Sequence, residues 1–366
     1  MAVTSAATRA ILVPKAFVRY ACERQLVCCR ASIRAPVGQA EEARITEVLG
    51  QTEAGRVLAA GLSATIERDG PRPLWRQHAG SCAHLLVPSR DATPPPSPSC
   101  RLQDAGGFHA LPTACRTFPR SITRVDDALE VVFALSCPTA ARLLVEGAAE
   151  PFAWVALPLS DPAAWPYTAT RVAAQRVRLA DGTGSPSGCP ETASQADLVA
   201  LRSAWWVALA RARHDAASLL ALLGALLATP TSAPPAAAPP APDTLGDGLR
   251  PPLAHRVVDL LGATPGRGAH YRKHFWSAFE GLLDPVTPKA MVAAVGAFPE
   301  LVEAFVSHEL AWAALHDDRP IAVHWRLTVR RAMLATRLVE ALLTSVPLPT
   351  ATLYRDAFAI TPFFDP

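Results

Sequence analysis

The residues that come nearest to nucleophilic chemistry lie in the stretch Gly80-Ser81-Cys82-Ala83-His84. Cys82 or Ser81 could attack a substrate with His84 as the base, because residues two apart in a strand point to the same face. A nucleophile elbow has glycine on both sides of the nucleophile, and a third group orients the base. This stretch lacks that pattern, so we predict no catalytic residue and expect the protein not to be an enzyme. Cys82 and His84 are the pair that tests this expectation.

Two histidines with a possible metal-binding spacing, His270 and His274, lie four residues apart and would share one face of a helix. A zinc metalloprotease helix has glutamate directly after its first histidine, and this chain has Tyr271 there. The positions between Tyr271 and His274 are basic, Arg272 and Lys273, so the start of a basic helix is the preferred interpretation. We predict no metal and no cofactor.

The cysteines indicate a reducing compartment. All eight precede residue 190, and none forms a C-x-x-C pair. The first residues lack the apolar core and cleavage pattern of a signal peptide, so we expect a cytosolic or nuclear protein with reduced thiols. One alternative stays open, a zinc ion bound by some of Cys22, Cys28 and Cys29 together with a distant histidine.

Two further motifs are interpreted as structural. The glycine-rich run Gly262–Gly268 lacks the lysine and the serine or threonine of a phosphate-binding loop, and no predicted strand precedes it. The paired carboxylates Asp317 and Asp318 come just before Pro320 at a predicted helix start. Acidic residues are favourable there because they face the positive end of the helix dipole. We therefore expect a loop and a helix cap at these places.

Four helical segments, separated by prolines, are predicted between Arg267 and Pro347. In the first, apolar residues recur at spacings of four, four and three from Tyr271 to Leu282, which is one face of a helix. The others begin near Thr287, Pro299 and Asp318, where a cap residue or a proline stands at the helix start. We expect these segments to pack into one helical lobe.

The first 190 residues favour strands more than helices. Leu129–Leu135 is the clearest predicted strand, and Ala10–Tyr20 and Gln25–Ile33 also lean towards β structure. Gly38–Leu49 has the spacing of a short helix, and Val57–Ile66 is ambiguous or strand-like. Shorter or weaker strand candidates are Leu85–Val87, Phe152–Leu159 and Thr170–Leu179.

These patterns predict an α+β chain in four parts. An α+β lobe, mixed and β-leaning, covers 1–190, and a long helix opened by Thr192 or Ser194 covers 191–228. A linker rich in proline and alanine covers 229–252, and an all-α helical domain covers 253–366. The apolar run within the long helix, Ala216–Ala228, is shorter than the roughly 20 residues that span a bilayer, so we predict no transmembrane segment.

Arginine outnumbers lysine 32 to 3, asparagine is absent and proline reaches 35, which together indicate a GC-rich genome. Because codon usage explains the arginines, they are weak evidence for nucleic-acid binding. The net charge of +3 supports no strong preference for acidic partners. We interpret Arg326, Arg330, Arg331 and Arg337 as a solvated helix face that could contact a partner, with phosphate binding as the less favoured alternative. Aromatic candidates for a partner surface are Trp205, Trp206, Trp276 and Trp312.

A resemblance to a known family rests on three strings of this chain: Leu201–Val207, Pro288–Val292, and Val57–Leu62 followed by Ser81–Leu85. These strings resemble a two-lobed family of tegument proteins from herpesviruses with GC-rich genomes. The resemblance implies a non-enzymatic virion adaptor that binds other tegument or capsid proteins and host factors, in the host cytoplasm or nucleus. It carries over no functional residue. The alternative is an accessory subunit of a nucleic-acid replication or packaging complex that uses the arginine face.

Overall fold

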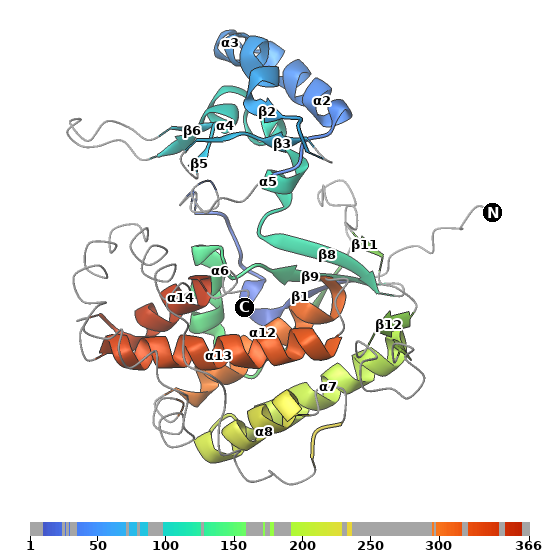
Figure 1. Cartoon of the computed structure of the whole chain (residues 1–366), viewed down its shortest axis with the longest axis vertical. Coiled ribbons are helices and arrows are strands. Elements are labelled where there is room, and N and C mark those ends of the chain that lie inside the picture. The colour runs from blue at the N-terminus through green and yellow to red at the C-terminus, as the bar shows by residue number, and fades with distance from the viewer. Residues whose placement is uncertain are drawn as a thin grey trace. The chain divides into compact units, whose positions relative to one another are not determined.

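The structure, a computed structural model, describes most of the N-terminal half of the chain and the main C-terminal helices (Figure 1). The described residues are 10–23, 26, 29, 35–70, 73–78, 81–86, 98–125, 128–158, 171–172, 176–178, 192–228, 233–235, 295, 298–316, 321–343 and 348–360. Helices and strands occur together, which confirms the predicted α+β class. The predictions for Gln25–Ile33, the linker 229–252 and the helices between 267 and 297 lie largely or wholly outside the described residues.

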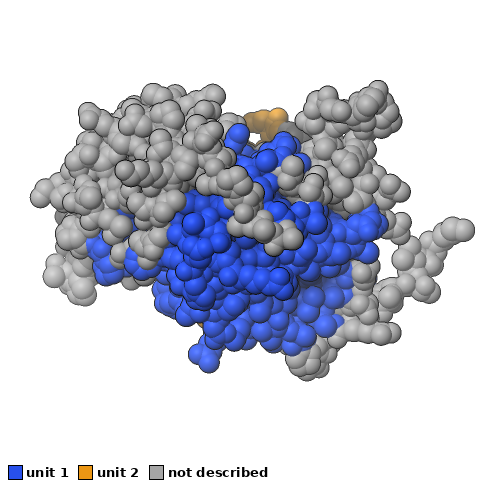
Figure 2. All heavy atoms as spheres, turned by 90° about the horizontal axis from the view of Figure 1, so that it is seen from below, with its two compact units in different colours: residues 1–20, 119–366 blue, residues 21–118 orange. Residues whose placement is uncertain are grey.

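The chain forms two units, coloured separately in Figure 2. Unit 1 comprises residues 1–20 and 119–366, and unit 2 comprises residues 21–118. This division differs from the predicted boundary after residue 190. The reason is that strands of the predicted N-terminal lobe pack with the C-terminal helices, whereas residues 21–118 pack mainly among themselves. Each unit is described by itself below.

Unit 1 is built on a five-stranded mixed sheet with the order β10-β1-β9-β8-β11. The strands are β1 (Ala10–Pro14), β8 (Arg120–Val125), β9 (Ala128–Phe133), β10 (Trp154–Pro158) and β11 (Arg171–Val172). β1 runs parallel to β9 and antiparallel to β10, and β8 pairs antiparallel with β9 and parallel with β11. A separate pair joins β12 (Arg176–Arg178) to β13 (Thr192–Ser194).

The predicted strand Leu129–Leu135 is confirmed as β9, near the middle of this sheet. Successive residues of a strand point to opposite faces, and Val131 and Val132 are both fully buried. The sheet is therefore covered on both faces at this point. This explains why β9 has a continuous apolar run rather than a polar and apolar alternation.

The helices described in unit 1 pack against one another, and α12 joins them to the sheet (Figure 1). Helix α12 packs against β8, β9 and α13, and α14 packs against both α6 and α13. Helix α7 lies against α12 and α8. Every residue of α12 from Leu301 to Ala311 is buried, which makes this helix the centre of the unit. Their bounds are α6 (Pro138–Gly147), α7 (Gln195–Ala212), α8 (Ala216–Ala228), α12 (Pro299–His316), α13 (Ile321–Leu343) and α14 (Thr350–Ile360).

The single long helix predicted over 191–228 is wrong, because the structure breaks it into α7 and α8. Ser194 does open α7, with a capping box in which its hydroxyl accepts from the Asp197 backbone N–H at 3.1 Å. A turn at Arg213 and His214 ends α7. Asp215 then caps α8, since its carboxylate accepts from the backbone N–H groups of Ala217 and Ser218. Helix α14 was not predicted.

Unit 2 is mainly helical, contrary to the expectation of a β-leaning region. Its helices are α2 (Gln39–Gly50), α3 (Glu53–Gly61), α4 (Arg101–Gly106) and α5 (Thr113–Thr117). The remaining pairs are the short strands β2 (Ile66–Glu67) with β3 (Leu74–Trp75), β4 (Gln77–His78) with β5 (Ser81–Cys82), and β6 (Leu85–Leu86) with β7 (Ser99–Cys100). The prediction for Gly38–Leu49 is confirmed by α2, and the strand-like interpretation of Val57–Ile66 is wrong.

Two features explain why α3 is a helix. Thr52 caps it, with its hydroxyl accepting from the Gly55 backbone N–H. Gly55 also lets α3 approach the end of α2 closely, because a Cβ atom there would lie 2.1 Å from the Leu49 carbonyl oxygen. The helix hairpin then covers a core that includes Ile45, Leu49 and Trp75.

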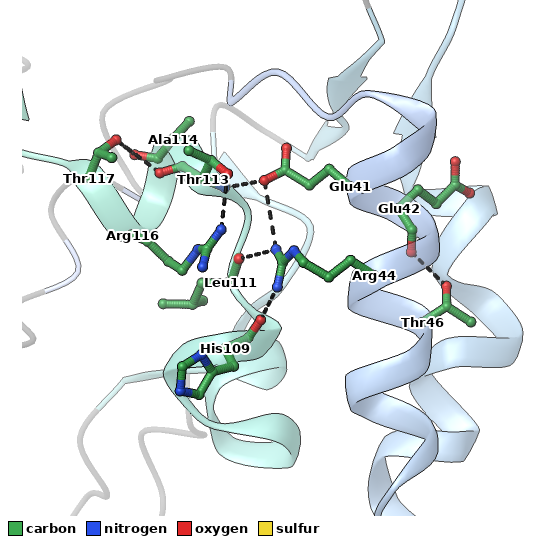
Figure 3. Close-up of polar contacts among 10 residues, drawn as sticks. All are labelled: Glu41, Glu42, Arg44, Thr46, His109, Leu111, Thr113, Ala114, Arg116 and Thr117. Atoms are coloured by element: carbon green, nitrogen blue, oxygen red, sulfur yellow. Dashed lines mark hydrogen bonds and ion pairs between the residues drawn. The ribbon is translucent and has the colours of Figure 1, made fainter. Parts of the chain in front are cut away.

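A polar network on unit 2 ties α2 to the segment that follows α4 (Figure 3). Arg44 donates to the carbonyl oxygens of His109 and Leu111, the latter at 2.8 Å. Glu41, one turn before Arg44 on the same helix, accepts from the Thr113 backbone N–H at the start of α5. Backbone groups that no regular ladder satisfies are thus paired by two side chains of one helix face.

Candidate functional site

The candidate nucleophilic pair of unit 2, Cys82 and His84, packs against other residues of that unit. His84 is buried, its Nε2 atom lies 3.1 Å from the Thr65 hydroxyl, and its ring packs edge-on against Trp75. Burial, aided by the nearby positive charge of Arg101, lowers the pKa of His84 to about 4. The imidazole is therefore neutral at physiological pH and is held inside the core of unit 2. Cys82 is half-buried on β5.

The tryptophan pair of α7 belongs to the interior of unit 1. Trp205 is fully buried, so it is a core residue and offers no surface to a partner in this structure. Trp206 donates from Nε1 to the Ser307 carbonyl oxygen at 2.9 Å and contacts the rings of Phe152 and Trp154. Both tryptophans thus attach α7 to neighbouring elements. The burial of Trp205 agrees with the core role that is more usual for such a pair, and partner binding by the half-buried Trp206 stays a prediction.

Arg202, on the same helix as these tryptophans, is buried together with the carboxylate of Glu130. Arg202 makes two hydrogen bonds to Glu130 of β9, at 2.7 and 3.0 Å, and both side chains are almost inaccessible, at 2% and 4% exposure. Its guanidinium also lies over the Trp206 ring at 4.7 Å. A paired, stacked and enclosed arginine is well suited to fix α7 on the sheet.

The arginines of α13 face in different directions. Arg326 and Arg330 are exposed, one helical turn apart. Arg326 donates from Nε to the Leu227 carbonyl oxygen near the end of α8, at 3.0 Å. Arg331 lies 3.8 Å from the buried carboxylate of Glu309. The side chains of Arg337 and Trp312, and the whole of Trp276, lie outside the described residues.

Helix α12 contains an unusual group of buried polar side chains. Glu303 lies 3.9 Å from the buried Arg213 and accepts from the Ser307 hydroxyl at 2.7 Å. His308 lies with Nε2 2.8 Å from the Phe133 carbonyl oxygen. Burial raises the pKa of Glu309 to about 7 and lowers the pKa of His308 to about 4. These groups connect α12 to the sheet, α7 and α13, and they are enclosed by protein on all sides.

A hollow with direct access to solvent lies elsewhere on unit 1. It is a half-open groove of about 470 Å³. One wall is the end of β1 and the turn that follows it, and the other is α6 with the segment that joins α6 to β10. Ala304 of α12 also lines the groove. We call it the α6 groove. Its volume falls in the range of about 300–1,000 Å³ that is usual for binding sites.

The lining of the α6 groove is mostly apolar. Val18 is 43% exposed at its edge, and Leu143, Phe152 and Val155 are half-buried along it. Gly147 allows α6 and the turn after β1 to meet closely, because a Cβ atom there would lie 2.8 Å from the Ala16 Cβ. A partly open apolar hollow of this kind can accept an apolar side chain of another molecule.

Charged side chains surround the α6 groove. Lys15 forms an ion pair with Glu150, and Glu146 forms one with Arg142 at 2.7 Å. Arg19 is exposed at the groove and, within the described ranges, has no ion-pair partner. The groove can therefore bind apolar side chains at its floor and select charge at its edge.

Sequence reasoning missed the α6 groove. Its walls come from residues 14–19, 143–155 and Ala304, and no local pattern indicates that such distant segments meet. The one available signal was Val18, an apolar residue beside Arg19 near the end of the β-leaning run Ala10–Tyr20.

Over the described residues, no group of three or more histidine, cysteine, aspartate or glutamate side chains is placed to hold a metal ion. Within the same ranges, no helix combines the length and hydropathy that a bilayer crossing requires. Comparisons with known proteins give no match to a family model, to a curated protein or to a solved structure.

Proposed function

We propose that this protein is a non-enzymatic adaptor that binds another protein through the α6 groove. The observation that carries the proposal is the groove itself, half open, lined by apolar side chains and edged by charges. Burying exposed apolar surface is the main driving force of protein association, and an exposed residue such as Val18 gains from being covered. The edge charges give selectivity.

The placement of two buried histidines makes them unsuitable as general bases. His84 and His308 are buried and neutral, with a ring nitrogen beside a core hydroxyl or carbonyl oxygen. A general base must reach the proton that it abstracts, and these two imidazoles face protein atoms instead. The polar groups of unit 1 that we describe serve to join helices and strands.

The resemblance of the three strings to herpesvirus tegument proteins supplies a setting for this proposal. In that setting the partner is another structural protein of the virion or a host protein, and the adaptor acts in the host cytoplasm or nucleus. The groove requires only that the partner present apolar side chains.

A nucleic-acid accessory role is the second candidate, and the exposure of both Arg326 and Arg330 on one face of α13 favours it. It ranks second because Arg326 also bonds to α8 and Arg331 lies beside Glu309. This alternative predicts binding to DNA or RNA that weakens steeply as salt rises. Arg330→Glu should then reduce the binding.

Capture of partners by three tagged full-length chains tests the adaptor proposal. Ala149 is exposed at the groove, so Ala149→Trp should fill it. Ala200 is exposed on α7, away from the groove lining, and Ala200→Trp is the matched control. We expect at least one protein that the wild type and Ala200→Trp retain and Ala149→Trp loses. Equal recovery by all three chains, each folded by circular dichroism, would contradict the proposal.

A further inference from the structure

We infer that the α6 groove takes an amphipathic helix of the partner, with an acidic side chain of that helix against Arg19. The inference rests on the proposed function and names the chemistry of the occupant. Three observations support it: backbone groups along the groove are already hydrogen-bonded, Arg19 at its edge has no described ion-pair partner, and the hollow is open to solvent on one side.

The backbone groups of the groove wall argue for a helix rather than an added strand. The Lys15 N–H donates to the Ala153 carbonyl oxygen, which continues the pairing of β1 with β10. The Glu150 N–H donates to the Gly147 carbonyl oxygen, and the Ala148 carbonyl oxygen accepts from Arg213. Strand addition needs donors and acceptors that are still available, whereas a helix satisfies its own backbone and buries only its apolar face.

The charges at the edge argue for an acidic partner. The two carboxylates of the groove, Glu146 and Glu150, each have a basic partner within unit 1. Arg19 has none among the residues that the structure describes, so it is the charged group of the lining that a partner can still pair with. A glutamate or aspartate beside the apolar stripe of a partner helix would pair with Arg19, and a lysine there would be repelled.

The shape of the hollow argues for protein side chains rather than for a small ligand. A pocket for a small molecule encloses most of that molecule's surface, whereas the α6 groove is half open. Val18 and Phe152 both line the hollow, so a helix laid along it can place apolar side chains against them. Apolar residues three and four positions apart on one helix face match such a surface.

The test is a selection with a displayed library of helical peptides, in which one face carries apolar residues and the flanking positions are randomised among Glu, Gln and Lys. The full chain is the bait, beside Ala149→Trp, Arg19→Glu and the control variants Ala200→Trp and Arg211→Glu. Arg211 is exposed on α7 and does not line the groove. Synthetic copies of the enriched peptides are then titrated against each chain by fluorescence anisotropy, at low and high salt.

We expect acidic flanking positions to be enriched, and the selected peptide to bind about tenfold more tightly than its lysine counterpart. Arg19→Glu should reverse that preference, Ala149→Trp should abolish binding, and both controls should bind like the wild type. Added salt should reduce the preference, since exposed charges are screened.

The remaining outcomes separate this inference from the proposed function. Peptides that need the groove but show no acidic preference, or a preference unchanged by Arg19→Glu, would overturn the inference and leave the adaptor proposal standing. Peptides that bind equally well to Ala149→Trp, or no enriched peptides at all, would overturn the inference; unchanged partner capture by Ala149→Trp would overturn the adaptor proposal. If Ala149→Trp fails to fold, Val18→Glu at the groove edge replaces it.

Discussion

The two units hold their elements together with different kinds of polar contact. In unit 1 the arginine–carboxylate pairs that join elements are buried, as in Arg202 with Glu130 at 2% and 4% exposure. In unit 2 they are partly solvated, as in Arg68 with Glu42 at 44% and 21% exposure. Arg44 of unit 2 bonds mainly to backbone carbonyl oxygens.

This difference follows from where the partners lie in the fold, not from their separation in the chain, since the exposed contact of Glu41 with Thr113 in unit 2 also spans 72 positions. Glu130 and Arg202 are separated by 72 positions, and they meet only when α7 docks on the sheet. Burying two charges is costly, and the cost is recovered only by close pairing and good hydrogen bonds. Loss of one partner should therefore cost more in a buried pair of unit 1 than in the exposed pair Arg68–Glu42 of unit 2.

The largest expected effect is the loss of one partner from the buried pair of unit 1. Glu130→Ala should destabilise unit 1 by about 3–5 kcal/mol, because it leaves the Arg202 charge buried without compensation. Urea unfolding with hydrogen exchange followed separately in each unit measures the change. The double variant Glu130→Leu with Arg202→Met is the control and should recover most of the loss. If Glu130→Ala lowers the free energy of unfolding by less than about 1 kcal/mol, the Arg202–Glu130 pair contributes no more than an exposed pair does.

The pH dependence of unit 1 should reveal two opposing groups on α12. The pKa of Glu309 is raised to about 7 from its ordinary 4.5, so its contribution is full below pH 4.5 and is lost as pH rises through 7. The pKa of His308 is lowered to about 4 from 6.5, so its contribution is full above pH 6.5 and is lost as pH falls through 4. In the wild type the effects of Glu309 and His308 on the unfolding free energy should largely cancel between about pH 4.5 and 6.5.

Removing one of these groups should expose the other. In Glu309→Gln, the stability of unit 1 should rise with pH between about 4 and 6.5, by at most about 3 kcal/mol, because the effect of His308 is then opposed only in part, by Glu303, whose pKa burial also raises. Unfolding free energies measured at half-unit pH intervals would show the slope. The same flat profile in the wild type and in Glu309→Gln would refute the opposing roles.

The backbone-directed arginine of unit 2 should have an intermediate effect. Arg44→Ala removes donors to two carbonyl oxygens between α4 and α5, and we expect a loss of about 1–2 kcal/mol in unit 2 alone. Hydrogen exchange of residues 108–117 is the readout. Arg56→Ala is a suitable control, because Arg56 is exposed on α3 and its bond to the Gly50 carbonyl oxygen is long, at 3.4 Å. Equal effects of the two substitutions would contradict a specific role for Arg44.

The smallest effect is expected for the exposed pair of unit 2. Arg68→Ala should cost less than about 1 kcal/mol, because solvent and salt screen its contact with Glu42. Thermal unfolding at low and high salt checks this value. A loss comparable to that of Glu130→Ala would remove the distinction between the two units.

Local pattern predicted the elements with strong periodicity or clear boundaries. Leu129–Leu135 has the β-branched run of a buried strand, and the helices that begin near Pro299 and Asp318 have apolar stripes after proline. The errors occurred where local signals conflict. Val57–Ile66 contains residues that suit either state, and Gly55 against α2 decides for the helix. Asp215 reads as one more helix residue until its capping bonds are seen.

The candidate site could not be predicted to the same degree. Trp206 is apolar and conspicuous in the sequence, yet whether it faces solvent or Phe152 depends on how α7 packs. The α6 groove joins segments more than 100 residues apart, and each segment alone is unremarkable.

The sequence by itself determined the α+β class, the central strand and several helix starts, because propensity, periodicity and capping act between near neighbours in the chain. Tertiary structure alone decided the division into units, the burial of Arg202 with Glu130 and the hollow beside Arg19. Those features arise from contacts between residues far apart in the chain. Such contacts depend on which faces pack together, and that choice is made by the whole core rather than by any one segment.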